Sequence, residues 1–256
     1  MQTPQGEVFL TALVFVAFLF LWWAYVRILD LSNLVLPGPL TVWRSLLENV
    51  SSGLLLVHLW VTLSEILLGF LAGSVLGISL GTVIAHSQLA RKILNPYILA
   101  SQAMPKLALA PIFVVWFGYG LLPKIVITAL ICFFPLLENT IIGLTEVSPH
   151  QIELFRALTA SRWQTFYKLR VPNALPVIFA GLRVAITLAV VGAVVGEYVG
   201  ANRGLGALII ATQGNFDTPL MFAVFVVLTV VGVVLYKGMQ CLEKTFFAWR
   251  YLKRGD

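Results

Sequence analysis

Residues 58–86 read HLWVTLSEILLGFLAGSVLGISLGTVIAH, and this run decides the fold class. A helix of about 20 mainly apolar residues spans the hydrocarbon core of a bilayer, and Glu65 is the only acidic residue in a run that has no Lys or Arg. Small residues recur at every fourth position, namely Gly69, Gly73, Gly77 and Gly81. Such a stripe allows another helix to approach closely. We expect a membrane span whose stripe packs within the subunit; lining of a transport path is the alternative.

The composition of the whole chain supports a membrane protein. Hydrophobic residues make up 59% of the 256 residues and charged residues 11%, whereas soluble domains carry about 25% charged residues. A water-soluble fold of this size could not bury so much apolar surface. The net charge of +6 could suggest nucleic acid, but the basic residues lie mainly between apolar runs, which is typical of topology-setting charge. We therefore exclude a nucleic-acid partner and expect the lipid bilayer as surroundings.

Five further apolar runs give about six spans in an all-α membrane protein. Pro105 and Pro111 interrupt one of them. The runs cover Val8–Leu29, Leu94–Phe117, Lys124–Leu144, Leu175–Val199 and Pro219–Leu242. The first run lacks the basic residues that precede a signal-peptide core, so we expect a retained span. An amphipathic stretch, Leu40–Glu48, is expected at the membrane surface, and no polar stretch is long enough for a second domain within residues 1–256.

The distribution of basic residues predicts the orientation. The loops after the second and fourth spans and the C-terminal tail, residues 243–256 with Lys237 just before it, hold eleven Lys and Arg. The opposite side holds four: Arg27, Arg44, Lys124 and Arg203. This asymmetry predicts that both termini are cytoplasmic in a multi-pass protein. Cys132 and Cys241 lack metal-ligand spacing, so we expect no metal site and interpret both as small buried residues.

The loop at residues 147–172 predicts two short helices. Ser148 followed by Gln151, and Ser161 followed by Gln164, each have the spacing of a capping box. The helices should meet near Thr159–Ser161, and Val171-Pro172 should end the second one. The first helix would place Ile152, Phe155 and Leu158 on one face. A cytoplasmic loop of this kind is either a membrane-surface element or a docking surface, and the residues alone leave both open.

The same loop resembles the coupling loop of ABC importer permeases, whose pattern is Glu-Ala-Ala, three residues, Gly, nine residues, then Ile-x-Leu-Pro. Glu153 takes the place of the Glu, Thr159 that of the Gly, and Pro172 that of the Pro. Residues 111–120, PIFVVWFGYG, and residues 172–176, PNALP, are similar to the nitrate/sulfonate/taurine-type permeases. Gly196-Glu197-Tyr198 and Arg203-Gly204-Leu205-Gly206 are similar to them as well. The resemblance covers about residues 59–250.

This resemblance implies a type I ABC importer permease fold in a prokaryotic cytoplasmic (inner) membrane, with a core at residues 58–242. It implies partners: a second permease copy as a homodimer, cytoplasmic ATPase subunits and an extracytoplasmic substrate-binding protein. The chain has no Gly-x4-Gly-Lys-Ser/Thr phosphate loop, so ATP and Mg would be bound by the partner and no cofactor by this chain. The residues expected to couple to the ATPase are Ile152, Glu153, Phe155, Leu158, Thr159, Ala160, Ser161 and Pro172.

Charged residues inside spans are costly and mark functional candidates. The candidates for the translocation path are Lys106, Glu138, Asn139, Glu197 and Arg203. For Lys106 and Glu197 a structural ion pair or backbone cap is favoured over lining of the path, and Glu65 and Arg183 are expected to pair structurally. The glycine-rich stretch Gly192–Gly206 suggests non-helical backbone at a gate, with an ordinary loop as the alternative.

The transported substrate is predicted only weakly, because in this architecture the binding protein usually sets specificity. Residues 141–144, 192–200 and 217–220 look closest to the branch that carries thiamine-precursor pyrimidines, such as hydroxymethylpyrimidine, or riboflavin. Nitrate, taurine and alkanesulfonates are the alternative. A passive channel would not need a doubly capped cytoplasmic loop. A membrane-embedded enzyme would need a convergent site, and no catalytic triad or metal-ligand spacing stands out.

Overall fold

The computed structural model describes residues 4–246, and every regular element among them is helical. The helices are α1 Pro4–Ile28, α2 Pro39–Ser51, α3 Leu54–His86, α4 Gln88–Ala103, η1 Lys106–Leu109, α5 Ala110–Phe117, α6 Leu121–Thr145, α7 Pro149–Ala157, α8 Arg162–Thr165, η2 Phe166–Arg170, α9 Val171–Tyr198, α10 Leu205–Gly214 and α11 Thr218–Phe246. Most of the predicted C-terminal tail, residues 247–256, lies outside the described residues.

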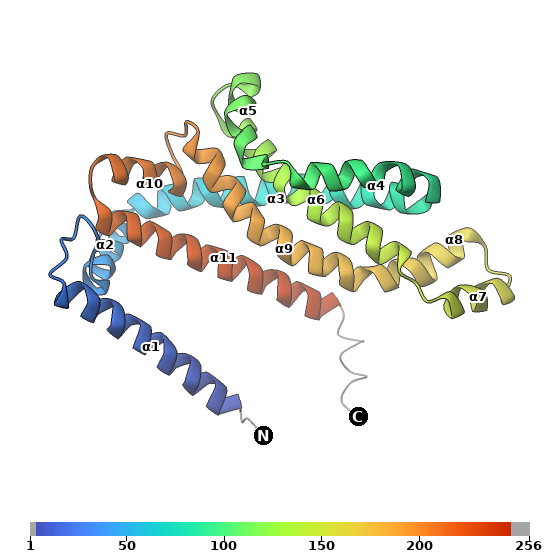
Figure 1. Ribbon diagram of the computed structural model, residues 1–256, viewed down its shortest axis with the longest axis horizontal. Helices are drawn as coiled ribbons and strands as arrows, with labels where there is room; N and C mark the ends of the chain where they lie inside the picture. Colours follow the sequence, from blue (N-terminus) through green and yellow to red (C-terminus); the bar gives the residue numbers. More distant parts are fainter. Residues whose placement is uncertain (1–3, 247–256) are drawn as a thin grey trace.

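The prediction of about six spans is confirmed. Five helical segments are long and apolar enough to cross a bilayer, and a bent pair makes a sixth. Figure 1 shows α3, α6, α9 and α11 running along the long axis, with α2 and α10 at one end and α7 and α8 at the other. Most of helix α1 lies apart from this bundle, and nothing in its apolar window is buried, although Trp22 packs against Phe222 of α11. The loop at residues 147–172 therefore lies at the end opposite α2 and α10.

The glycine stripe of α3 packs against α6, as the sequence predicts. A Cβ at Gly73 would lie 2.5 Å from the carbonyl oxygen of Ala129 and 2.8 Å from the Cβ of Cys132. Gly77 and Gly81 meet Phe133, Leu137 and Thr140 in the same way. The two backbones thus touch along several turns, and only the absence of a side chain permits this. The stripe serves packing within the subunit.

The third span consists of two helical segments with a sharp bend between them. Helix α4 ends at Ala103, and the following η1–α5 segment turns away by 78°. Of the two expected interruptions, only Pro105 lies at this break. Pro111 occupies the first turn of α5, where a missing N–H costs nothing because helical donors are unpaired there anyway.

Two further expectations are corrected in part. The amphipathic helix α2 buries Val42 in a cluster with Leu55, Leu208 and Leu220, so it covers one end of the bundle rather than only lying on the membrane. Cys132 is buried as expected, whereas Cys241 is exposed. The apolar neighbours of Cys241 along the sequence predicted burial, but Cys241 lies on the exposed side of α11, whereas Met239 and Glu243 face the bundle.

Candidate coupling loop and intramembrane polar residues

The two helices of the predicted coupling loop are α7 and α8, and only one of the two expected capping boxes forms. Gln164 N–H donates to Ser161 Oγ at 3.2 Å, and Ser161 N–H donates to Gln164 Oε1 at 2.8 Å. At the start of α7, the Ser148 side chain caps nothing. Its carbonyl accepts instead from the Gln151 and Ile152 amides. Because Pro149 has no N–H, this helix terminus has one fewer unpaired donor. A side-chain cap is therefore less needed here.

Thr159 ends α7 in the left-handed region, with φ of 52°. Ala160 N–H donates to the Phe155 carbonyl at 3.0 Å, and Thr159 N–H donates to the Arg156 carbonyl at 2.9 Å. These two bonds form a Schellman motif with Thr159 at the position that usually holds glycine. The turn therefore does use positive φ although a β-branched residue occupies it, and such a residue is strained there.

The predicted docking face of α7 is divided. Ile152 and Phe155 are half-buried, while Leu158 is 66% exposed. Leu154, which is not among the expected coupling residues, is 56% exposed. Its spacing of four from Leu158 places both on one side of the helix, and this spacing was the signal in the sequence. The exposed apolar pair of α7 is thus Leu154 and Leu158.

The inner side of the loop contains a cationic cavity of about 460 Å³. Its lining comprises His86, Ile152, Arg156, Ala160, Arg162, Thr165, Phe166 and Arg170. The His86 ring lies 4.6 Å from the Phe166 ring, which joins the end of α3 to the segment after α8. Ile152 therefore faces inward to this cavity, toward the end of α3.

Pro172 does not end the second helix, contrary to the sequence prediction. Residues Arg162–Tyr198 form one continuous helical segment of 37 residues. The π-turn Phe166–Arg170 leads directly into α9, and Val171 N–H donates to the Phe166 carbonyl. This wider turn brings the chain into α9 with Pro172 in its first turn, where a proline is tolerated. Motion of α8 would therefore pass directly to the α9 span.

A second group of polar residues is buried between α3, α6, α9 and the α9–α10 loop. Lys124 Nζ lies 2.7 Å from Glu65 Oε1, and Thr62 Oγ1 donates to Glu197 Oε1 at 2.6 Å. The other Glu197 oxygen accepts from Gly206 N–H, and Leu205 N–H donates to Thr62 Oγ1 at 2.7 Å. Glu197 is 1% exposed, so in this conformation it fastens the loop to the spans.

The glycine-rich stretch expected to be non-helical is mostly helical. Gly192 and Gly196 belong to α9 and pack on Thr128 and Lys124 of α6. The irregular part covers residues 199–204, between α9 and α10. Gly204 has φ of 123°, and a Cβ there would collide with the Glu197 carboxylate. Arg203 is exposed in this loop.

The five path candidates fall into two places. Glu197 and Arg203 lie at the α9–α10 end. The other three lie along α4, η1 and α6: Gln102 Nε2 donates to Glu138 Oε2 at 2.8 Å, and Lys106 Nζ lies 4.4 Å from the centre of the Phe134 ring. Asn139 donates to the Pro135 carbonyl of its own helix at 2.8 Å.

The expected structural pairs are confirmed, and their partners were not predicted. Glu65 pairs with Lys124, and Arg183 Nη1 lies 2.6 Å from Glu243 Oε2. From the sequence, Lys124 was expected only as one of the four basic residues on the non-cytoplasmic side. In the structure it is nearly buried at the start of α6. Among residues 4–246, no group of three or more His, Cys, Asp or Glu side chains could hold a metal ion.

Comparison with known proteins identifies the chain's relatives. Residues 73–246 match the family described as "Binding-protein-dependent transport system inner membrane component". The formylaminopyrimidine transport permease protein ThiX of Halalkalibacterium halodurans is 37% identical over 93% of this chain and 94% of its own length. The riboflavin transport system permease protein RibX of Chloroflexus aurantiacus is 38% identical over 89% of this chain and 85% of its own length. The taurine transport system permease protein TauC of Escherichia coli is 30% identical over 89% of this chain and 85% of its own length.

Solved structures agree at the level of the fold. A chain from the inward-facing MetNI methionine ABC transporter matches with a TM-score of 0.64 at 21% identity, covering 75% of this chain and 95% of that one. The all-helical fold is therefore that of type I ABC importer permeases. The chain belongs to the binding-protein-dependent transport system inner membrane components, and it is a permease subunit of an ABC importer of the nitrate/sulfonate/taurine type rather than an enzyme.

Proposed function

We propose that the loop at residues 147–172 docks on a cytoplasmic ATPase and transmits its closure to the spans. The observation that carries this proposal is the continuous helix from Arg162 to Tyr198. It begins directly after the Thr159 turn and ends beside Glu197. Leu154 and Leu158 form an exposed apolar pair on α7, as helix-in-groove recognition requires. The domain arrangement expected from the sequence, a core at residues 58–242 with a cytoplasmic tail, belongs to the same proposal.

The transported compound in this proposal is a small vitamin-like heterocycle, delivered by an extracytoplasmic binding protein. Its support is the order of similarity among relatives: those named for formylaminopyrimidine and riboflavin are 37% and 38% identical, and the one named for taurine is 30% identical. An anionic sulfonate or taurine is the second candidate. Lys106 and Glu138, on facing elements near the bend of the third span, are the residues that we propose to line the path.

Reconstitution tests the substrate. The permease, its ATPase and the binding protein from the same operon are placed in liposomes, and ATP-dependent uptake of a formylaminopyrimidine, riboflavin and taurine is compared. We expect uptake of one of the two heterocycles and none of taurine. Uptake of taurine alone would contradict the heterocycle and favour the second candidate. Lys106→Gln should change uptake, whereas Lys237→Gln, at an exposed site on α11, should not.

We further propose a homodimer with both termini in the cytoplasm. Eleven basic residues on the side of the α7–α8 loop support this orientation. The exposed Cys241 and buried Cys132 give a direct test with a membrane-impermeant maleimide. Cys241 should react in inside-out vesicles and stay unmodified in right-side-out vesicles, with a C241S variant as the control. The reverse pattern would contradict the orientation, and light scattering of the purified permease would test the dimer.

A further inference from the structure

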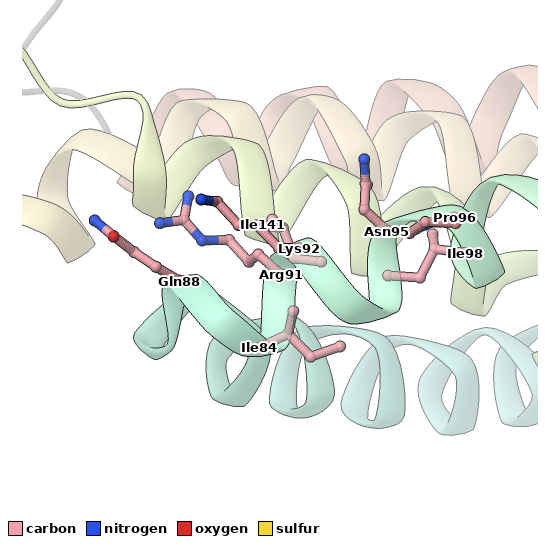
Figure 2. Close-up of a pocket in the computed structure, with 8 residues that line it drawn as sticks. All are labelled: Ile84, Gln88, Arg91, Lys92, Asn95, Pro96, Ile98 and Ile141. Carbon is pink, nitrogen blue, oxygen red and sulfur yellow. The ribbon is translucent and has the colours of Figure 1, made fainter.

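A pocket of about 570 Å³ lies where α3 ends and α4 begins, against α6. Figure 2 shows its lining, which is divided into two kinds of residue. The apolar part comprises Ile84, Pro96, Ile98 and Ile141, and the polar part comprises Gln88, Arg91, Lys92 and Asn95. The pocket is separate from the cavity inside the coupling loop and from the Glu65–Glu197 group.

The two cations of this pocket have no counter-charge. In Figure 2 the Arg91 and Lys92 side chains extend in the same direction from consecutive positions of α4. The two ion pairs formed within residues 4–246 are Lys124–Glu65 and Arg183–Glu243, so neither cation is neutralised by a described residue. Two like charges that point the same way repel each other. An anion between them would remove this repulsion.

Arg91 also has an unsatisfied donor. Its Nε atom is buried and has no hydrogen-bond partner among the described residues. Buried polar groups are almost always paired, and leaving a charged donor unpaired is costly. The guanidinium presents donors in a planar fork that fits the oxygens of a phosphate. The missing partner of Arg91 is therefore best supplied by a phosphate group from outside the chain.

The position of the pocket selects the source of that phosphate. Gln88 lies two residues after the end of the 33-residue span α3, so the polar rim lies at the level of the lipid headgroups. Anionic lipids give the cytoplasmic leaflet its negative surface, which attracts clustered Lys and Arg, and the orientation proposed above from charge asymmetry, on which this inference rests, places this end in that leaflet. A free phosphate would use only the polar half, whereas a phospholipid would also cover the isoleucines.

We propose that this pocket binds an anionic phospholipid. Arg91 and Lys92 hold its phosphate, Gln88 and Asn95 supply further polar contacts, and an acyl chain lies over Ile98 and Ile141. Bound there, the lipid joins α3, α4 and α6 at the end of the molecule that carries α7 and α8. The proposal does not depend on which compound the importer carries.

Native mass spectrometry of the full-length permease in detergent tests this site, with phosphatidylglycerol and phosphatidylcholine as probes. Each basic residue near a membrane surface contributes about 1 kcal/mol to binding anionic lipid, so R91Q/K92Q should weaken phosphatidylglycerol binding at least about tenfold. K237Q/K244Q removes two charges from exposed positions on α11 that do not line the pocket, and because exposed charges away from the site are screened it should weaken binding less than about twofold. Equal losses in the two variants would overturn the site.

Two further arms separate the sources of phosphate. Inorganic phosphate and glycerol 1-phosphate should fail to displace the lipid at concentrations where phosphatidylglycerol saturates. Displacement by either would overturn the lipid assignment in favour of a free-phosphate site. Because the double variant could fold poorly, R91K/K92R is measured beside it: this variant keeps both charges but loses the guanidinium at position 91, so its binding should lie between that of R91Q/K92Q and that of the wild type. Binding of phosphatidylcholine as tight as that of phosphatidylglycerol would also overturn the proposal.

Discussion

Thr159 is a residue whose backbone conformation and side chain disagree. It holds φ of 52° at the end of α7, where left-handed geometry costs about 1–2 kcal/mol for a residue with a Cβ. Thr159→Gly should therefore slow hydrogen exchange of the Thr159 and Ala160 amides by about fivefold or more, since 1 kcal/mol corresponds to this factor. Thr165→Gly, at a right-handed helical position, should speed exchange in α8. Faster exchange at Ala160 in Thr159→Gly would show that the turn does not need positive φ.

Lys124 carries a buried charge whose loss should be severe. Lys124→Met leaves the Glu65 carboxylate, bound to Lys124 Nζ at 2.7 Å, without its counter-charge. Breaking one side of a buried pair costs about 3–5 kcal/mol, whereas replacing both sides by neutral groups is often much less harmful. The double variant Glu65→Gln/Lys124→Met should recover most of the stability. The temperature at which Cys132 becomes open to labelling, in a C241S background, measures the stability of both variants. Equal losses of stability in the single and double variants would contradict the Glu65–Lys124 pair.

Single residues show what the sequence could and could not predict about the site. That Glu65 and Arg183 need partners follows from the cost of charge in a span. Which partners they find does not, because Lys124 and Glu243 are 59 and 60 residues away along the chain. The packing of helices decides such pairs, and no local pattern records it. The half-buried position of Ile152 has the same origin, since Ile152 faces a cavity that His86, at the end of α3, also lines.

At the scale of helices, the contact between α3 and α6 depends on glycine. Gly73→Ala would place a Cβ 2.5 Å from the Ala129 carbonyl oxygen, and overpacking of this kind costs about 1–3 kcal/mol. Gly232→Ala, in α11, meets nothing within 4 Å and is the matched control. We expect Gly73→Ala to lower the thermal unfolding temperature and Gly232→Ala to leave it unchanged or raise it. Equal temperatures for the two variants would argue against close α3–α6 packing.

Helix ends were harder to predict than helix cores. An apolar run of about 20 residues must form a helix in a bilayer to pair its backbone polar groups, so the spans can be predicted from the sequence. The ends depend on competing contacts. The Ser148 side chain does not cap α7, because Pro149 leaves one fewer unpaired N–H at that end. Pro172 does not end the helix that begins with α8, because the π-turn at Phe166–Arg170 continues it into α9. The break at Pro105 was predicted, but its 78° bend was not.

At the scale of the whole molecule, the fold places two candidate functional regions at opposite ends of one helix. Residues Arg162–Tyr198 connect the exposed loop to the group around Glu197. In that group Thr62 of α3 bonds Glu197 of α9 and the Leu205 amide at the start of α10, which anchors both ends of the loop at residues 199–204 to α3. A displacement of α7 and α8 by an ATPase would thus reach the far end of the span. The family resemblance predicted this architecture because its motifs are spread over the chain rather than confined to the loop.

Docking of α7 on the ATPase through Leu154 and Leu158 can be tested by ATP hydrolysis in a reconstituted system. Substrate-stimulated ATP hydrolysis is measured in liposomes that contain the ATPase and either the wild-type permease or Leu158→Asp. A carboxylate on the 66% exposed Leu158 cannot enter an apolar groove without a large desolvation cost. Asn202→Asp, exposed at the opposite end of the molecule, adds the same charge as a control.

We expect Leu158→Asp to fold and insert normally, to lose the ATPase on purification and to lose stimulated hydrolysis by tenfold or more, since the desolvation cost exceeds about 1.4 kcal/mol. The Asn202→Asp control should keep both the ATPase and its stimulation. If the Leu158→Asp permease still co-purified with the ATPase and supported hydrolysis at the wild-type level, docking through α7 would be contradicted.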